Sequence, residues 1–397
     1  MELLIMYWIE KELGLLADAS LERSLCENSL VPKSPGFTLR GGRMLLNMSS
    51  NDYLGLSQHP AIIKAMHEAL LTEGAGSGAS RLVTGNRPSY GRLEEALADW
   101  QKCEAALVLA NGYMANSGVI GTLVGRGDVV FSDQLNHASI VDGIVLSRAE
   151  HARYRHNDMD HLRTLLEKYR DKRRKLIVTD AVFSMDGDLA PLRELVTLKH
   201  EYGAMLMVDE AHSGGIYGVH GEGLCHELRL QDDVDIHMGT FSKSFGVYGA
   251  YICGNRTLIR WLVNKARPLI YSTALPPSII AGISKALILV KVENWRRERL
   301  FAAGKLFRSL LRAAGFTIGI GDSPIVPLIV GDNATTLRFS DALEASGIAS
   351  AAIRPPTVPN GTARIRFSLS ATHTFKELTD AAAVIQTIGL QLGVLNS

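Results

Sequence analysis

Short apolar runs alternate with longer amphipathic ones through the middle of the chain, from about residue 100 to residue 255. The apolar runs predict six strands, at residues 105–109, 129–132, 176–179, 205–208, 236–239 and 250–253. Most are separated by about twenty or more residues, which is enough for the crossover helix that joins parallel strands. The pattern therefore predicts an α/β unit with a mainly parallel sheet covered by helices on both faces.

The segments on either side of this unit predict a different organisation. A helix and an irregular arm precede it up to residue 43, followed by a helix at about 60–71. After it we expect one long helix at 276–314, strands at 325–330 and 363–369, and helices at 335–345 and 375–392. We therefore expect an N-terminal helix and arm (1–45), a large domain (46–285) and a smaller C-terminal α+β domain (286–397).

Composition and charge exclude several classes of protein. Hydrophobic residues make up 46% of the chain and charged residues 21%, which is typical of a folded globular protein. The 42 Lys and Arg residues nearly balance the 41 Asp and Glu residues, so the chain lacks the basic field that nucleic acid binding requires. The apolar stretch at 3–9 is too short to span a membrane, and we expect a cytoplasmic protein. The four cysteines lie far apart, which favours neither a metal site nor disulfides.

Polar and glycine residues follow the predicted strands, at 111–113, 133–137, 180–184, 209–212 and 240–243. In parallel sheets ligands bind beyond the carboxyl ends of the strands, so these residues mark the expected site. Two familiar phosphate motifs do not apply. Gly304-Lys305 lacks the rest of a P-loop, and the glycines at 74–78 follow a helix where a dinucleotide fingerprint follows a strand.

The most informative pattern is Asp209 and His212 after one predicted strand, with Thr240 and Lys243 after the next. Separately, an Asp-x-x-His is usually structural and a lysine is usually solvated. Together they suit pyridoxal phosphate: an aspartate stabilises the protonated pyridine nitrogen, and a lysine amine forms the Schiff base that carries the cofactor. Thr240 and the amides of a helix that begins at 112–113 are suited to hold the phosphate.

These and other motifs resemble the α-oxoamine synthase family of fold-type I pyridoxal-phosphate enzymes. The resemblance covers nearly the whole chain and rests on residues 50–56, 133–139, 182–188, 208–212, 240–243 and, most specifically, 352–366. It implies an aminotransferase-like fold with a seven-stranded sheet. It also implies a homodimer with shared active sites, in which an amino acid is condensed with an acyl thioester.

The resemblance also implies roles for single residues. Lys243 corresponds to the lysine that binds the cofactor and moves the α-proton, and Asp209 to the partner of the ring nitrogen. His212, together with Ser184, corresponds to the partner of the phenolic oxygen, and His137 to the imidazole stacked on the ring. The remaining residues expected to bind the cofactor are Gly112, Tyr113, Thr240 and, from the second subunit, Thr273.

The residues expected to bind the substrates lie towards the two ends of the chain. Arg366 resembles the arginine that pairs with the amino-acid carboxylate, because its planar fork matches a carboxylate. The other expected substrate residues are Asn51, Arg354, Thr357 and Arg23, and for Arg23 a solvated surface arginine is an equal alternative.

The substrates themselves are less well defined by the sequence. The 353–366 stretch favours the branch of the family that joins alanine to a pimeloyl thioester, on coenzyme A or on a carrier protein. Branches that use other amino acids and acyl groups stay open, as does a non-catalytic regulator built on the same fold.

Two positions depart from the family pattern. Residues 213–215 are Ser-Gly-Gly where the family usually has a central threonine, and Phe245 is a bulky residue close after Lys243.

Overall fold

The computed structural model describes residues 6–395, which separate into two compact units. The larger contains residues 52–184 and 189–298. The smaller contains the chain up to Asn51, the short segment Met185–Asp188, and the chain from Arg299 onward.

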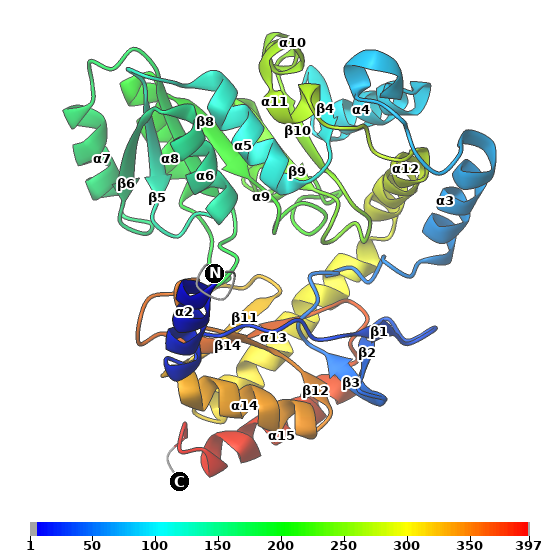
Figure 1. The fold of residues 1–397 in the computed structure, drawn as a ribbon, viewed down its shortest axis with the longest axis vertical. Helices are drawn as coiled ribbons and strands as arrows, with labels where there is room; N and C mark the ends of the chain where they lie inside the picture. Colours follow the sequence, from blue (N-terminus) through cyan, green and yellow to red (C-terminus); the bar gives the residue numbers. More distant parts are fainter. Residues whose placement is uncertain (1–5, 396–397) are drawn as a thin grey trace. The chain divides into compact units, whose positions relative to one another are not determined.

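The larger unit is built on a seven-stranded sheet in the order β4-β10-β9-β8-β7-β5-β6 (Figure 1). Strand β10 runs antiparallel to both its neighbours, and the other strands are parallel to one another. Six strands match the predicted ones to within one residue at each end, namely β4 (Ala105–Leu109), β5 (Val129–Asp133), β7 (Lys175–Asp180), β8 (Met205–Asp209), β9 (Ile236–Thr240) and β10 (Ala250–Gly254). The predicted α/β class is confirmed.

The seventh strand, β6 (Glu150–Tyr154), has no counterpart among the apolar runs of the sequence. It lies at the edge of the sheet, parallel to β5. Glu150 and Arg153 are exposed, whereas Ala152 and Tyr154 are buried. An edge strand with one solvent-exposed face carries too few apolar residues to form a continuous apolar run. The hydrophobic pattern of the sequence therefore did not reveal β6.

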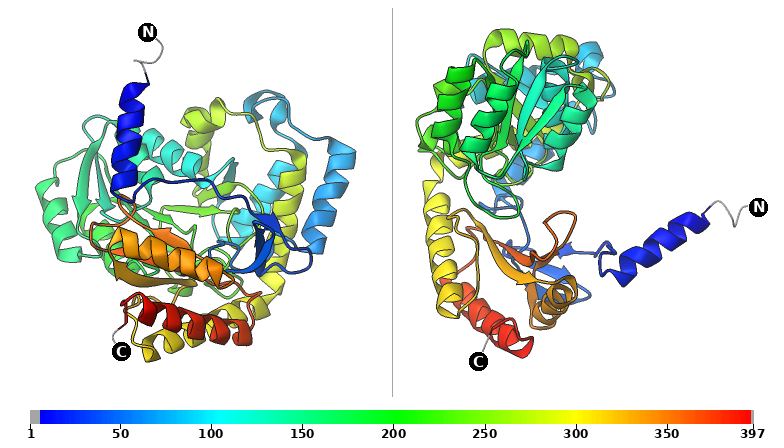
Figure 2. Two further views of the ribbon diagram at one scale, coloured as in Figure 1. Left: turned by 60° about the horizontal axis from the view of Figure 1, so that its bottom comes forward. Right: turned by 90° about the vertical axis from the view of Figure 1, so that its left-hand side faces the viewer.

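Helices cover both faces of this sheet (Figures 1 and 2). Alternate strand residues share one core with α5 (Gly112–Leu123), α6 (Ala138–Ser147), α10 (Arg256–Lys265) and α11 (Arg267–Ile270). The helices that contact the sheet from its other face are α4 (Pro88–Trp100), α7 (Met159–Lys168) and α8 (Leu192–Tyr202). The short α9 (Leu224–Glu227) and the packed pair α3 (Pro60–Glu73) and α12 (Pro277–Val292) complete the unit.

The prediction of a single long helix at 276–314 is wrong. The chain forms α12 and α13 (Asn294–Ala313), which are separated at Glu293. The Arg297 guanidinium donates to the carbonyl of Val290 at 2.5 Å, and Arg296 pairs with Glu293 at 2.6 Å. A side chain thus occupies a carbonyl at the end of α12 that a continuing helix would need for its own backbone.

The smaller unit begins with the predicted helix, α2 (Tyr7–Asp18), all of whose side chains are at least partly exposed. The arm after it is more regular than expected, because it forms β1 (Ser29–Leu30), β2 (Phe37–Arg40) and β3 (Arg43–Asn47). Gly41 and Gly42 join β2 to β3 and both have positive φ, at 54° and 76°. Two adjacent glycines suit a tight hairpin turn, a signal that the sequence analysis did not use.

The rest of the smaller unit confirms the predicted elements. These are the strands β11 (Ile325–Gly331) and β14 (Ala363–Ser368) and the helices α14 (Asn333–Ala345) and α15 (Phe375–Gln391). Strand β13 (Ala351–Ile353) pairs with β14, and β12 (Ile348–Ala349) pairs with β3. None of the helices within residues 6–395 is long and apolar enough to cross a bilayer.

Gly246 closes the turn that follows Lys243, and its backbone gives the first prediction. Its φ is +65°, and a Cβ atom there would lie 2.3 Å from the backbone nitrogen of Ser57. We expect Gly246→Ala to destabilise the protein by at least about 1–2 kcal/mol. Gly121→Ala is the control, since Gly121 lies inside α5 with open space around it and should gain up to about 1 kcal/mol. Urea unfolding measures both, and equal stability of the two variants would contradict this account.

Candidate active site

A cavity of about 180 Å³ lies in the larger unit and is lined by residues that follow its parallel strands. It is lined by eight of the nine residues predicted to hold the cofactor, namely Gly112, Tyr113, His137, Ser184, Asp209, His212, Thr240 and Lys243. The structure therefore brings together side chains from segments that are far apart in the sequence.

Asp209 ends the central strand β8 and is 4% exposed. One carboxylate oxygen accepts the amide N–H of Ala211 at 2.9 Å. The other accepts the side-chain amide of Asn116 at 2.7 Å, from helix α5. The carboxylate is thus held in one orientation at the edge of the sheet.

Lys243 and His212 meet in the same cavity. The Nζ atom of Lys243 lies 2.8 Å from Nε2 of His212, and Nδ1 of His212 lies 2.7 Å from the hydroxyl of Tyr53. Tyr53 is fully buried and belongs to the 50–56 motif, although sequence reasoning gave it no role. The three groups form a chain along which a proton can shift by small movements.

His137 caps the N-terminus of α6. Its backbone N–H donates to the carboxylate of Asp180 at 3.0 Å. Burial lowers the pKa of His137, and nearby Lys243 lowers it further while Asp209 opposes the shift. Burial and the charge of Asp209 raise the pKa of Asp180 well above its usual value. The neutral forms of His137 and Asp180 are therefore favoured in the cavity.

The start of α5 supplies the anion-binding end of the cavity. Asn111 caps the helix by accepting the amide of Met114 at 2.9 Å, and the first helical residues are Gly112 and Tyr113. Such amides have no acceptor within their own helix and carry partial positive charge. The hydroxyl of Thr240 donates to the carbonyl of Gly249 at 2.8 Å, so it must rotate to donate elsewhere. A helix N-terminus, a buried carboxylate and an amine around one cavity fit pyridoxal phosphate.

Six further residues line the cavity, and Asn116, Ser139 and Asp180 are among them, although the sequence gave none of these three an individual role. Asn116 lies one helical turn after Gly112, so the period of α5 could have indicated it. Ser139 and Asp180 lie within or beside recognised motifs, but their side-chain directions depend on the fold.

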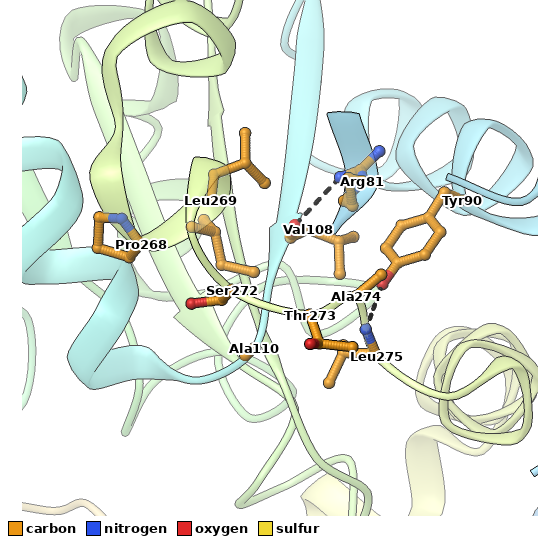
Figure 3. A pocket seen from close by; sticks show the side chains of 11 residues that line it. Arg81, Tyr90, Val108, Ala110, Pro268, Leu269, Ser272, Thr273, Ala274 and Leu275 are labelled. Atoms are coloured by element: carbon orange, nitrogen blue, oxygen red, sulfur yellow. Dashed lines mark hydrogen bonds between the residues drawn. The ribbon is translucent and has the colours of Figure 1, made fainter. Parts of the chain in front are cut away.

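Thr273, the ninth predicted cofactor residue, does not line this cavity. It lies between α11 and α12 and lines a separate, smaller pocket with Arg81 and Tyr90 (Figure 3). Arg81 lies over the ring of Tyr90 at 4.0 Å, and the Tyr90 hydroxyl accepts the amide of Leu275 at 2.8 Å. Within one chain, the structure does not bring Thr273 to the other eight residues.

The predicted substrate residues lie in the smaller unit, in two groups. Arg366 on β14 is 5% exposed and donates to the side-chain oxygen of Asn51 at 3.3 Å and to the hydroxyl of Ser368 at 2.7 Å. The second group is Arg354, Arg23 and Thr357.

Arg354 holds this second group together. Its guanidinium donates to the backbone carbonyls of Ser20 and Glu22. Its own carbonyl accepts the amide of Thr357 at 3.2 Å. Burial and the neighbouring charge of Arg23 lower the pKa of Arg354.

The two departures from the family pattern have structural explanations. Phe245 is fully buried and makes edge-on ring contacts with Trp100 and Phe241, at centroid distances of 5.7 and 5.3 Å. Ser213 is also buried, and its hydroxyl donates to the carboxylate of Glu210 at 3.2 Å. Both residues therefore pack the protein interior.

Glu210 belongs to a second buried cluster, in which Glu210, Cys225 and His237 place their ligand atoms within 4.8 Å of one another. Nδ1 of His237 faces the Glu210 carboxylate at 3.4 Å, and Nε2 faces the carbonyl of Gln231 at 3.0 Å. Two acceptors around one imidazole require a proton on each nitrogen, so the pair is a buried ion pair. Burial raises the pKa of the Cys225 thiol well above its usual value, which keeps it neutral and disfavours a metal.

Comparison with known proteins identifies the family. Residues 43–385 match the profile of the aminotransferases of class I and II. The chain belongs to the class I and II aminotransferase family. It is 52% identical over 356 residues to a protein of Geobacillus kaustophilus provisionally named 8-amino-7-oxononanoate synthase, covering 89% of this chain and 91% of that one. A protein of Halalkalibacterium halodurans with the same provisional name is 51% identical over 382 residues, 96% of each chain.

Solved structures agree on the fold. A serine palmitoyltransferase from S. paucimobilis with bound PLP has a TM-score of 0.93 and 33% identity, covering 99% of each chain. The 8-amino-7-oxononanoate synthase of Francisella tularensis has a TM-score of 0.77 and 28% identity, covering 88% of this chain and 99% of that one. The chain is thus a fold-type I acyltransferase of the α-oxoamine synthase kind, and its cofactor is pyridoxal phosphate.

The buried Glu210–His237 pair yields a pH-dependent prediction. Burial alone raises the pKa of Glu210, but the hydrogen bond and charge of His237 hold it below its usual value. A depressed pKa stabilises the fold above the unfolded value of about 4.3, and this stability is lost as the pH falls through the folded value. We expect Glu210→Gln to cost about 3 kcal/mol at neutral pH, and the deficit to shrink below about pH 4.3.

Urea unfolding at neutral and acidic pH measures this difference, with the exposed Glu95→Gln as a control of equal charge change. A deficit that stays constant down to the acidic limit would contradict the ion pair. So would stoichiometric zinc in the purified protein.

Proposed function

We propose that the protein condenses L-alanine with a pimeloyl thioester, carried on coenzyme A or on a carrier protein, and releases carbon dioxide. The product is 8-amino-7-oxononanoate, an intermediate of biotin biosynthesis. The observation that carries the proposal is the single cavity that contains Asp209, His212 and Lys243, in a chain about half identical to proteins named for this reaction.

The bound cofactor supplies a protonated pyridine ring that withdraws the electron pair left when the α-proton of the amino acid is removed. Lys243 is the group we assign to that proton transfer. Its amine lies 2.8 Å from Nε2 of His212, so the imidazole can hold the amine in place and exchange a proton with it. Tyr53 fixes His212 from its other side.

Asp209 acts by charge. Its carboxylate is buried and accepts hydrogen bonds from two neutral donors, Ala211 and Asn116, so much of its negative charge stays available to a cation on the ring. We propose that Arg366 binds the α-carboxylate of the substrate, because its planar guanidinium can donate two parallel hydrogen bonds to a carboxylate. The new carbon–carbon bond forms at the thioester carbonyl and the thiol leaves. The α-carboxylate departs as carbon dioxide, and the α-carbon takes up a proton in its place to give the amino ketone.

A serine palmitoyltransferase-like reaction is the second candidate, because such a structure has the higher TM-score, 0.93 against 0.77. Backbone similarity reports the fold, which many functions share, whereas the substrate is set by local contacts. The sequence identity of 51–52% to the proteins provisionally named 8-amino-7-oxononanoate synthases exceeds the 33% to the palmitoyltransferase. We therefore favour alanine and a pimeloyl group.

A substrate panel tests the proposal. Alanine, glycine and serine are each assayed against acetyl, pimeloyl and palmitoyl thioesters, and we expect kcat/KM to be highest for alanine with pimeloyl. Lys243→Ala is the control, since it should fold and lose turnover. Borohydride reduction of the parent should place the pyridoxyl label on Lys243. A preference for serine with palmitoyl would overturn the substrate assignment, and a label on another lysine would overturn the site.

We also propose that the enzyme is a homodimer in which Thr273 serves the partner's cofactor. Support comes from the absence of Thr273 among the residues that line the cavity of its own chain. Placing a carboxylate at this position should repel the cofactor phosphate and weaken its binding in whichever site Thr273 serves.

Mixing Lys243→Ala with Thr273→Asp under conditions that exchange subunits tests the arrangement. If Thr273 acts across the dimer, each mixed dimer has one site with both lesions and one site with neither, so activity should reappear. Each unmixed variant serves as its own control. A mixture no more active than its components would refute the shared site.

A further inference from the structure

A continuous chain of buried hydrogen bonds joins Asp209 to His137 through two residues that have no assigned role. Asn116 donates to Asp209 at 2.7 Å and to the hydroxyl of Ser139 at 2.9 Å. The Ser139 hydroxyl lies 2.7 Å from Nδ1 of His137. Asn116 and Ser139 are each 1% exposed, so water does not compete for these bonds.

We propose that Asn116 and Ser139 are positioning residues that fix His137 as the tautomer protonated on Nε2 and tie its ring to Asp209. The inference rests on the proposed roles of Asp209 and His137 in the cofactor site. It follows from counting donors and acceptors along the chain.

The orientation of the Asn116 amide is set by Asp209. A carboxylate only accepts hydrogen bonds, so the NH₂ group must face it and the amide oxygen must point away. The same NH₂ group has a second hydrogen, which reaches Ser139. The amide oxygen is buried without a hydrogen-bond partner, which is the cost of turning both donors towards Asp209 and Ser139.

The direction of the remaining bonds follows from this orientation. The Ser139 hydroxyl accepts from Asn116, so its own hydrogen is available to His137. The backbone N–H of Ser139 also donates to Nδ1 of His137, at 3.2 Å. Two donors directed at Nδ1 require a lone pair there, and the proton of the neutral ring therefore lies on Nε2.

The surroundings of His137 also favour the neutral form of its ring. Burial lowers the pKa of His137, and Lys243 adds to this effect while Asp209 opposes it. Asp180 holds the backbone N–H of the same residue. A neutral imidazole with a known Nε2–H donor is suited to stack on a flat ring and donate one hydrogen bond to a substrate oxygen.

Nitrogen NMR of the holoenzyme, with labelled histidine, tests the tautomer without any substitution on the chain of bonds. We expect the His137 signals, assigned by their loss in His137→Asn, to show Nδ1 unprotonated and Nε2 protonated. A proton on Nδ1 at neutral pH overturns the proposal.

Ser139→Ala tests the role of the hydroxyl. Loss of one donor to the Nδ1 lone pair should raise the pKa of His137 by about half to one unit and increase the other tautomer. Ser139→Thr keeps a hydroxyl and should restore the parent values. Ser147→Ala is the control, because it removes a buried hydroxyl from the same helix that bonds to the carbonyl of Ile144 instead. An unchanged titration in Ser139→Ala contradicts the proposal.

Asn116→Ala tests the Asp209 end of the hydrogen-bond chain, since Asp209 loses one of its two hydrogen-bond donors. We expect the affinity of the apoprotein for pyridoxal phosphate, followed by fluorescence, to fall about tenfold, and the His137 tautomer to become mixed. If both readouts match the parent, Asn116 has no positioning role. None of these readouts needs an acyl donor, so a different substrate would leave them unchanged.

Discussion

The buried carboxylate of Asp209 is the constraint on which the site depends. A charged group at the end of a central strand cannot lie among apolar side chains without donors, because its desolvation costs several kcal/mol. The fold meets this need by placing α5 so that Asn116 reaches the carboxylate and by turning the chain at Ala211. The backbone at the same point is fixed as well, since the carbonyl of Asp209 accepts the amide of Ala181 at 2.8 Å. Strand register and side-chain chemistry are therefore set together.

The meeting of His212 and Lys243 depends on a second constraint, which is steric. The segments that carry them cross at Gly215, where φ is +86° and a Cβ atom would lie 2.6 Å from the Cβ of Ser244. Only glycine allows the two turns to approach this closely without strain. The Ser-Gly-Gly sequence at 213–215, which departs from the family pattern, thus still supplies the glycine that the geometry requires.

The sequence predicted the parts of the fold that are buried on both sides and missed the parts that are not. Strands such as β7 and β8 are continuous apolar runs, because helices cover both their faces. Strand β6 has a solvent-exposed face, so its sequence contains no continuous apolar run. The break at Glu293 depends on Arg297 reaching the carbonyl of Val290, a contact seven residues away that no helical period reveals.

The candidate site shows the same division. Lys243, Asp209 and His212 were predicted from motifs, and Asp180 was among the residues expected at the strand ends. Asn116, by contrast, belongs to the site only through a contact between helix α5 and strand β8.

Asp209 and Glu210 are adjacent carboxylates at the end of β8, and they point to different surroundings. Asp209 faces the cavity, whereas Glu210 lies in a separate buried cluster with His237, which precedes the cavity residue Met238 on the neighbouring strand. Glu210 pairs with the imidazole of His237 in that cluster. Asp209 has uncharged donors in Asn116 and Ala211, and its charge is left to favour a cation in the cavity. The two adjacent carboxylates therefore have different partners, and it is Asp209 that lines the cavity, whereas Glu210 pairs with His237.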